Sequence, residues 1–189
     1  MALRLESLQT IFASCRWRVM IPESLSALLA PIERHLLDEL RANWQWRVGS
    51  EYQVVGMTAM GDWLFADSAG AVHLLETVEA SFDRIADDMA ELVRLSASDE
   101  FRDDTFLEGF ALGALAGGQL PQNHCVGFKV PPILGGKFDP SNLQVAAVGT
   151  YQTWTGRLHE ARSKVPDGGQ VLGVDVADDG SVSVRWQSE

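Results

Sequence analysis

Apolar residues recur at helical spacing through the middle of the chain. These residues are Val78, Phe82, Ile85, Met89 and Leu92. Steps of four, three, four and three separate them, and this spacing places them on one face of a helix. Acidic residues lie between them, and Arg94 near the end suits the negative pole of the helix dipole. The pattern predicts a helix over residues 77–95.

Short apolar runs bounded by turn residues predict strands on both sides of that helix. The runs are 52–60, 63–66, 72–75, 124–130, 142–148 and 171–176, and a last strand passes through Val182, Val184 and Trp186. The first three runs predict an antiparallel meander. Further helices are expected in a stretch opened by Pro22-Glu23-Ser24 and at 32–40, 103–116 and 150–163. The predicted fold class is α+β, with antiparallel strands and hairpins and several amphipathic helices.

Composition places the chain among ordinary globular proteins. It has 189 residues, 46% hydrophobic and 22% charged, which is enough to bury a core without disulfides. We expect an N-terminal helical segment over 1–50 and an α+β region over 51–189, forming one compact unit. Glu6 and Gln9 interrupt the apolar core that a signal peptide needs, and no run approaches the ~18 apolar residues of a membrane span. The cytoplasm is therefore the expected location, with no membrane partner.

The negative charge is concentrated in one part of the chain. The formal net charge is −11, and residues 76–108 alone carry eleven acids and three arginines, a net charge of −8. Such a surface repels phosphate backbones, which disfavours direct binding of nucleic acid, and it attracts a basic partner. Trp44 and Trp46 fit either the core or an anchor for a partner, with the core favoured, whereas Trp154 and Trp186 fit core positions.

Residues that could carry chemistry are few. Cys125 could act as a nucleophile with His159 as its base, but His159 is expected on the solvated side of a helix, and a buried free cysteine is the commoner case. The four histidines lack metal-ligand spacing, so we expect no metal. Gly135-Gly136-Lys137 lacks the first glycine and the hydroxyl residue of a phosphate-binding loop. No cofactor is expected.

A longer pattern resembles a known family. Its parts are Gly-Phe-Lys-x-Pro-Pro at 127–132, Leu134-Gly135-Gly136, Asn142-Leu143, Tyr151-Gln152, Gly156, Leu158-His159-Glu160 and the turn Pro166-Asp167-Gly168. Upstream, Gly61-Asp62 precedes an aromatic strand and an amphipathic helix. Over roughly residues 54–172 the chain resembles immunity proteins that protect bacteria from DNase effectors of type VI secretion, in particular their C-terminal domain. Residues 1–50 and the hairpin after Gln170 depart from the pattern.

The resemblance implies a cytoplasmic inhibitor that is not an enzyme and that binds its cognate effector toxin, blocking the active site or access to the substrate. A DNA-cutting toxin presents positive charge, so the candidate toxin-binding residues are Asp83, Asp87, Asp88, Glu91, Trp44 and Trp46. Two alternatives remain open: a small cysteine-dependent hydrolase using Cys125 and His159, and an acidic regulatory or scaffold module with another protein partner.

Overall fold

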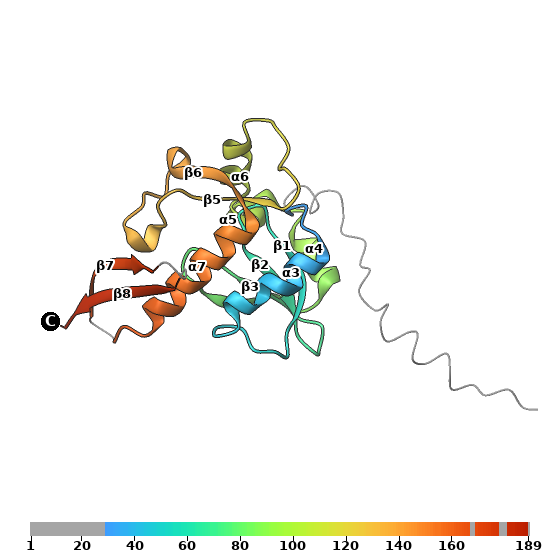
Figure 1. The fold of residues 1–189 in the computed structure, drawn as a ribbon. Helices are drawn as coiled ribbons and strands as arrows, with labels where there is room; N and C mark the ends of the chain where they lie inside the picture. Colours follow the sequence, from blue (N-terminus) through green and yellow to red (C-terminus); the bar gives the residue numbers. More distant parts are fainter. Residues whose placement is uncertain (1–28, 167–168, 178–180, 189) are drawn as a thin grey trace, which may run out of the picture.

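The computed structural model of the 189-residue chain describes residues 29–166, 169–177 and 181–188. In chain order the elements are α3 (Arg34–Leu40), η2 (Arg41–Trp44), β1 (Gln53–Met57), β2 (Trp63–Ala66), β3 (Val72–Leu75), β4 (Phe82–Ala86), α4 (Met89–Leu95), α5 (Asp99–Phe106), α6 (Glu108–Leu115), β5 (His124–Phe128), η3 (Pro132–Leu134), η4 (Pro140–Asn142), β6 (Leu143–Ala147), α7 (Val148–Ser163), β7 (Gln170–Val176) and β8 (Val182–Gln187). All strand pairs are antiparallel. The structure confirms the predicted α+β class (Figure 1).

A four-stranded meander in the order β1-β2-β3-β4 forms the centre of the molecule. Its first three strands confirm the predicted meander. The turn between β2 and β3 is closed by Asp67, whose Oδ1 accepts hydrogen bonds from the backbone N–H groups of Ala69 (2.9 Å) and Ala71 (3.0 Å). Gly70 adopts a φ of +95° in this turn, a conformation that L residues rarely reach. The turn chemistry visible in the sequence therefore sets this hairpin.

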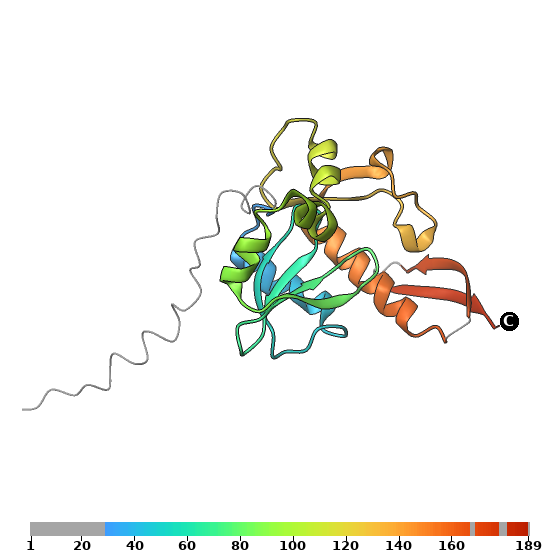
Figure 2. The same ribbon diagram turned by 180° about the vertical axis from the view of Figure 1, so that it is seen from behind.

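Helices pack on both faces of the meander (Figures 1 and 2). Because neighbouring side chains of a strand point to opposite faces, Trp63 and Phe65 join one apolar cluster while Leu64 joins another. The first cluster also holds residues of α3, η2 and α7, and the second holds residues of α4 and α5. The sheet is therefore covered by α3 and α7 on one side and by α4 and α5 on the other.

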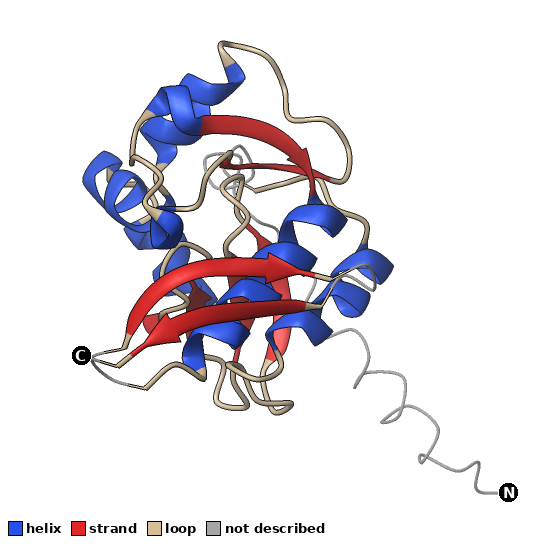
Figure 3. Ribbon diagram, turned by 60° about the vertical axis from the view of Figure 1, so that its left-hand side comes forward, coloured by secondary structure: helices blue, strands red, loops and turns tan. Residues whose placement is uncertain are grey.

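Two further hairpins extend from this body. Strands β5 and β6 pair with each other, and a third apolar cluster under them includes residues of α6. Strands β7 and β8 pair from Gln170↔Gln187 to Val176↔Val182 (Figure 3), and β8 contacts α7. Trp186 in β8 is 42% exposed, so the prediction that it is a core residue is wrong, and Trp154 is only partly buried. A narrow two-stranded ribbon has too little cover to bury both of its faces.

The predicted helix over 77–95 is wrong in its first half. Residues 82–86 form strand β4, which pairs with β3, and only Met89–Leu95 is helical. Phe82 packs with the first apolar cluster and Ile85 with the second, so the two lie on opposite faces of the sheet. Strand β4 sends one apolar side chain to each cluster, three positions apart, and the sequence pattern cannot distinguish this spacing from a helical step.

The predicted helix over 103–116 is divided at Leu107, which has a φ of +53°. Helix α5 begins earlier than predicted, at Asp99, where Ser98 caps it. Helix α6 ends before Ala116 and Gly117, which both have left-handed conformations. Helices α3 and α7 confirm the predictions over 32–40 and 150–163, with starts shifted by two residues. The helix predicted at Pro22-Glu23-Ser24 lies outside the described residues. Within the described ranges, no helix is long and apolar enough to cross a membrane.

Candidate functional site

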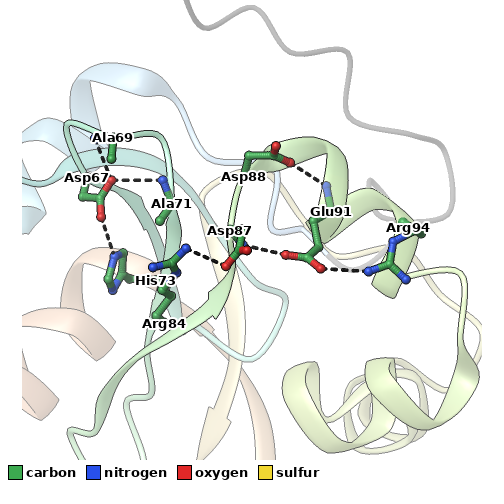
Figure 4. A network of polar contacts seen from close by, with 9 residues as sticks. All are labelled: Asp67, Ala69, Ala71, His73, Arg84, Asp87, Asp88, Glu91 and Arg94. Atoms are coloured by element: carbon green, nitrogen blue, oxygen red, sulfur yellow. Dashed lines mark hydrogen bonds and ion pairs between the residues drawn. The ribbon is translucent and has the colours of Figure 1, made fainter.

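The four candidate acids lie along the path from β4 into α4, and not within a single helix, as the predicted helix over 77–95 implied. We call Asp83, Asp87, Asp88 and Glu91 the acidic strip. Asp88 is the N-cap of α4: its Oδ1 accepts the backbone N–H of Glu91 at 2.8 Å. The Glu91 carboxylate in turn accepts the backbone N–H of Asp87 at 2.8 Å (Figure 4). Asp88 and Glu91 therefore fix the start of the helix, a role worth about 1 kcal/mol for such a cap.

Two arginines neutralise part of the acidic strip. Arg84 donates to Asp87, and Arg94 donates to Glu91 at 2.8 Å (Figure 4). The hydrogen bond from the Asp87 backbone, with a further contribution from Arg94, lowers the pKa of Glu91. Asp83 is exposed and has no ion pair among the described residues, and the side chain of Asp87 is 78% exposed. Asp83 is therefore the acid most open to a partner, and Asp87 presents an exposed carboxylate that it shares with Arg84.

The two candidate tryptophans have different roles. Trp44 is completely buried, and its Nε1 donates to Oε1 of Gln152 at 2.8 Å. Trp46 stacks on Trp44 with ring centroids 6.2 Å apart and is only partly buried. Trp44 is therefore a core residue, as the sequence analysis favoured. Trp46 remains available to a partner, because its ring forms one wall of a groove.

That groove has a volume of about 640 Å³, and we call it the Trp46 groove. Its apolar lining comes from Trp46, Val78, Ala80, Pro132 and Ile133, and its charged lining from Arg47, Glu79 and Arg162. Four separate segments supply these residues: the turn after η2, the turn between β3 and β4, η3, and the last turns of α7. Because no two segments are neighbours in the sequence, the pattern of residues gave no signal for Arg47, Ile133 or Arg162.

Gln152 connects the core of the molecule. Besides Trp44, its Oε1 accepts from Nε1 of Trp63 at 2.7 Å, and its Nε2 donates to the carbonyl of Gly61 at 2.7 Å. The residue is fully buried. One amide side chain of α7 thus satisfies groups from η2, β2 and the turn between β1 and β2. The Tyr151-Gln152 part of the sequence pattern is explained by this structural role.

Other residues of the pattern also serve packing. A Cβ at Gly127 would overlap the ring of Tyr151, and a Cβ at Gly156 would lie 2.6 Å from the backbone oxygen of Asn43. Both glycines therefore allow α7 to approach its neighbours closely. Asp62, of the Gly61-Asp62 pair, is buried, and burial raises the pKa of its carboxyl. It accepts hydrogen bonds from the N–H of Thr77 at 2.7 Å and from its hydroxyl at 2.8 Å, which fastens one turn of the meander to the end of β3.

The structure gives Cys125 and His159 separate environments. Burial raises the pKa of the Cys125 thiol to about 12, so the thiol is protonated at neutral pH. His159 is 4% exposed, which corrects the expectation of a solvated residue. Its Nε2 donates to the carbonyl of Thr77 at 3.0 Å, and the ring packs on Trp44 with centroids 5.8 Å apart. Cys125 and His159 share no hydrogen bond, so the arrangement lacks an activated nucleophile.

The described residues contain no group of three or more His, Cys, Asp or Glu side chains able to hold a metal ion. Two surface features form the candidate site: the acidic strip and the Trp46 groove. Such features suit recognition of another macromolecule.

Comparison with known proteins relates part of this chain to immunity proteins of the type VI secretion system (T6SS). Residues 86–159 match the family model of the T6SS immunity protein Tdi1, C-terminal. The match confirms the family resemblance seen in the sequence over these residues. It includes Asp87, Asp88 and Glu91 and leaves out Asp83, Trp44 and Trp46.

The other comparisons add little to the family match. No curated protein sequence matches the chain. The crystal structure of Atu4351 from Agrobacterium tumefaciens is similar, with a TM-score of 0.48 and 14% sequence identity, over 80% of this chain and 73% of that one.

Proposed function

We propose that this protein is an immunity protein that binds a cognate type VI secretion effector and neutralises it by occlusion, without catalysis. The observation that carries the proposal is the match of residues 86–159 to the immunity-protein family. The protonated Cys125 thiol and the lack of a base beside it favour this function over a hydrolase. The proposal places the protein in the cytoplasm, where an incoming effector would act.

We further propose that the effector is a basic nuclease, in particular a DNase. A protein that cuts DNA needs a positively charged surface for the phosphate backbone. The net charge of −11 and the exposed carboxylates of Asp83 and Asp87 suit contact with such a surface. An immunity protein that covers the DNA-binding surface excludes the substrate and needs no cofactor.

Co-expression tests the function directly. The effector encoded beside this gene is induced in a heterologous bacterium with and without the protein, and growth is followed. We expect growth to be restored and the two proteins to elute as one complex in size-exclusion chromatography. Continued growth arrest together with separate elution would contradict the proposal, and stable binding to a different, non-toxic protein would favour a scaffold.

The charge of the partner is tested by a matched pair of variants. Asp83→Asn removes one exposed charge from β4, and Glu39→Gln removes one from α3, which covers the opposite face of the sheet. Neither carboxylate forms an ion pair with any of the described residues. We expect Asp83→Asn to lower the association rate about two- to threefold at low salt, and Glu39→Gln to leave it unchanged. Equal association rates for the two variants would show that the acidic strip is not part of the interface.

A further inference from the structure

The Trp46 groove combines an apolar lining with an excess of positive charge. Trp46, Val78, Ala80 and Ile133 line it together with two arginines, Arg47 and Arg162. Glu79 is the single acid among the lining residues. On a protein with a net charge of −11, this local reversal of sign marks the groove as chemically distinct.

The arginines of the groove have hydrogen-bonding capacity to spare. Arg162 is partly buried, and its guanidinium has no hydrogen bond or ion pair with any residue that the structure describes. Arg47 donates from Nε to the carbonyl of Ala80 at 2.7 Å, and its two terminal nitrogens have no partner in the same described part. A guanidinium beside apolar surface binds a carboxylate in two-point geometry, which makes this pair a receptor for an acidic group.

The groove is also held in a fixed shape. Ala80 has a φ of +57°, a left-handed conformation that is unfavourable for alanine, and the hydrogen bond from Arg47 holds its carbonyl in place. On the other side, the hydrogen bond from His159 to Thr77 ties α7 to the same turn. Because the shape of the groove is set before binding, less conformational entropy is lost when a partner binds.

We infer that the Trp46 groove is the anchor site of the effector interface, and that it receives an effector segment carrying a carboxylate beside an apolar side chain. The inference rests on the proposed function. Tryptophan and arginine are the residue types that dominate binding energy at interfaces. The carboxylate would pair with Arg162 and Arg47, and the apolar side chain would pack on Trp46 and Ile133.

A single partner can cover the groove and the acidic strip together. The turn that lines the groove leads directly into β4, which is the outer strand of the meander. Ala80 and Asp87 are seven residues apart, about 20 Å along an extended chain. An ordinary interface of about 800 Å² per partner spans this length. The acidic strip would attract a basic effector, and the positively charged groove would fix the orientation in which the effector binds.

The test compares two substitutions that each remove one positive charge near the C-terminal end of α7. Arg162→Gln removes a charge from the groove, and Lys164→Gln removes one two residues later, outside the groove lining and paired with Glu160. Ile133→Asp is a second groove variant, which places a carboxylate where the apolar side chain of the effector is expected to pack. The probe is the purified effector encoded by the adjacent gene, inactivated in its active site. Dissociation constants are measured by calorimetry, and thermal unfolding confirms that each variant is folded.

We expect Arg162→Gln and Ile133→Asp each to weaken binding at least tenfold, and Lys164→Gln to change it less than twofold. If the wild-type protein binds and both groove variants bind as tightly, the inference is overturned while the proposed function stands. If the wild-type protein does not bind the effector, both fail. Weakening by Lys164→Gln equal to that by Arg162→Gln would show a general charge effect and would also overturn the inference.

Discussion

Replacing Gln152 by leucine is expected to destabilise this protein more than any surface change. Gln152 is fully buried and makes three short hydrogen bonds: two accepted from the indoles of Trp44 and Trp63, and one donated to the carbonyl of Gly61. Leucine has a similar size but no polar atoms. The substitution therefore creates little empty space and leaves three buried polar groups without partners.

The magnitude follows from those three groups. A buried donor or acceptor that loses its partner costs about 1–3 kcal/mol, so three of them cost about 3–9 kcal/mol before the structure relaxes. Relaxation and entry of water favour the lower end, and we expect a loss of about 4 kcal/mol in the free energy of unfolding. This is a large share of the ~5–15 kcal/mol that stabilises an ordinary domain.

Urea unfolding followed by tryptophan fluorescence measures this loss. The matched control is Gln144→Leu, which makes the same chemical change at an exposed position of β6 and should cost less than about 0.5 kcal/mol. The slope of free energy against urea concentration must stay constant for the comparison to hold. A loss below about 1 kcal/mol for Gln152→Leu would show that the three hydrogen bonds do not hold the core together as described.

Three further outcomes follow from the same structure. Burial lowers the pKa of His159 from its ordinary value of 6.5, so the native state binds the proton more weakly than the unfolded state. Stability should fall as pH drops below 6.5, and His159→Gln should flatten that part of a urea-unfolding series. Gly127→Ala should lower the melting temperature because its Cβ meets the ring of Tyr151, whereas Gly149→Ala, with open space around it, should not. Cys125 should resist iodoacetamide at pH 8 in the folded protein and react in urea, as followed by peptide mass spectrometry.

Local patterns predicted those parts of the fold that local residues determine. The meander over β1–β3 followed from short apolar runs with turn residues between them, such as Asp67 and Gly70. Helix α7 followed from its amphipathic spacing. Strand β4 could not be predicted in the same way, because Phe82 and Ile85 pack on opposite faces of the sheet but lie three positions apart, a spacing that also fits a helix. Pairing between strands decided the structure where the local pattern was ambiguous.

The candidate site also has one part that the sequence predicted and one part that it did not. The sequence identified the acidic strip by charge alone, and the structure places its residues on a strand, a cap and a helix start. The Trp46 groove could not be predicted from the sequence, because tertiary packing brings its lining segments together. Trp46 itself was a candidate, but only the structure separates it from the buried Trp44. Charge can be counted along a chain, whereas concavity cannot.

The residues that carry the family pattern hold the fold and leave recognition to other positions. Gln152, Gly127 and Gly156 fix how α7 packs on its neighbours, and none of them is exposed. Of the residues that we assign to effector contact, Trp46 and Arg162 lie outside the matched range of 86–159, whereas Asp87 and Ile133 lie inside it. Packing residues such as Gln152 also lie inside that range, so the match covers part of the scaffold together with part of the contact surface. Which effector is bound must depend on surface side chains that can change without disturbing the hydrogen bonds of the core.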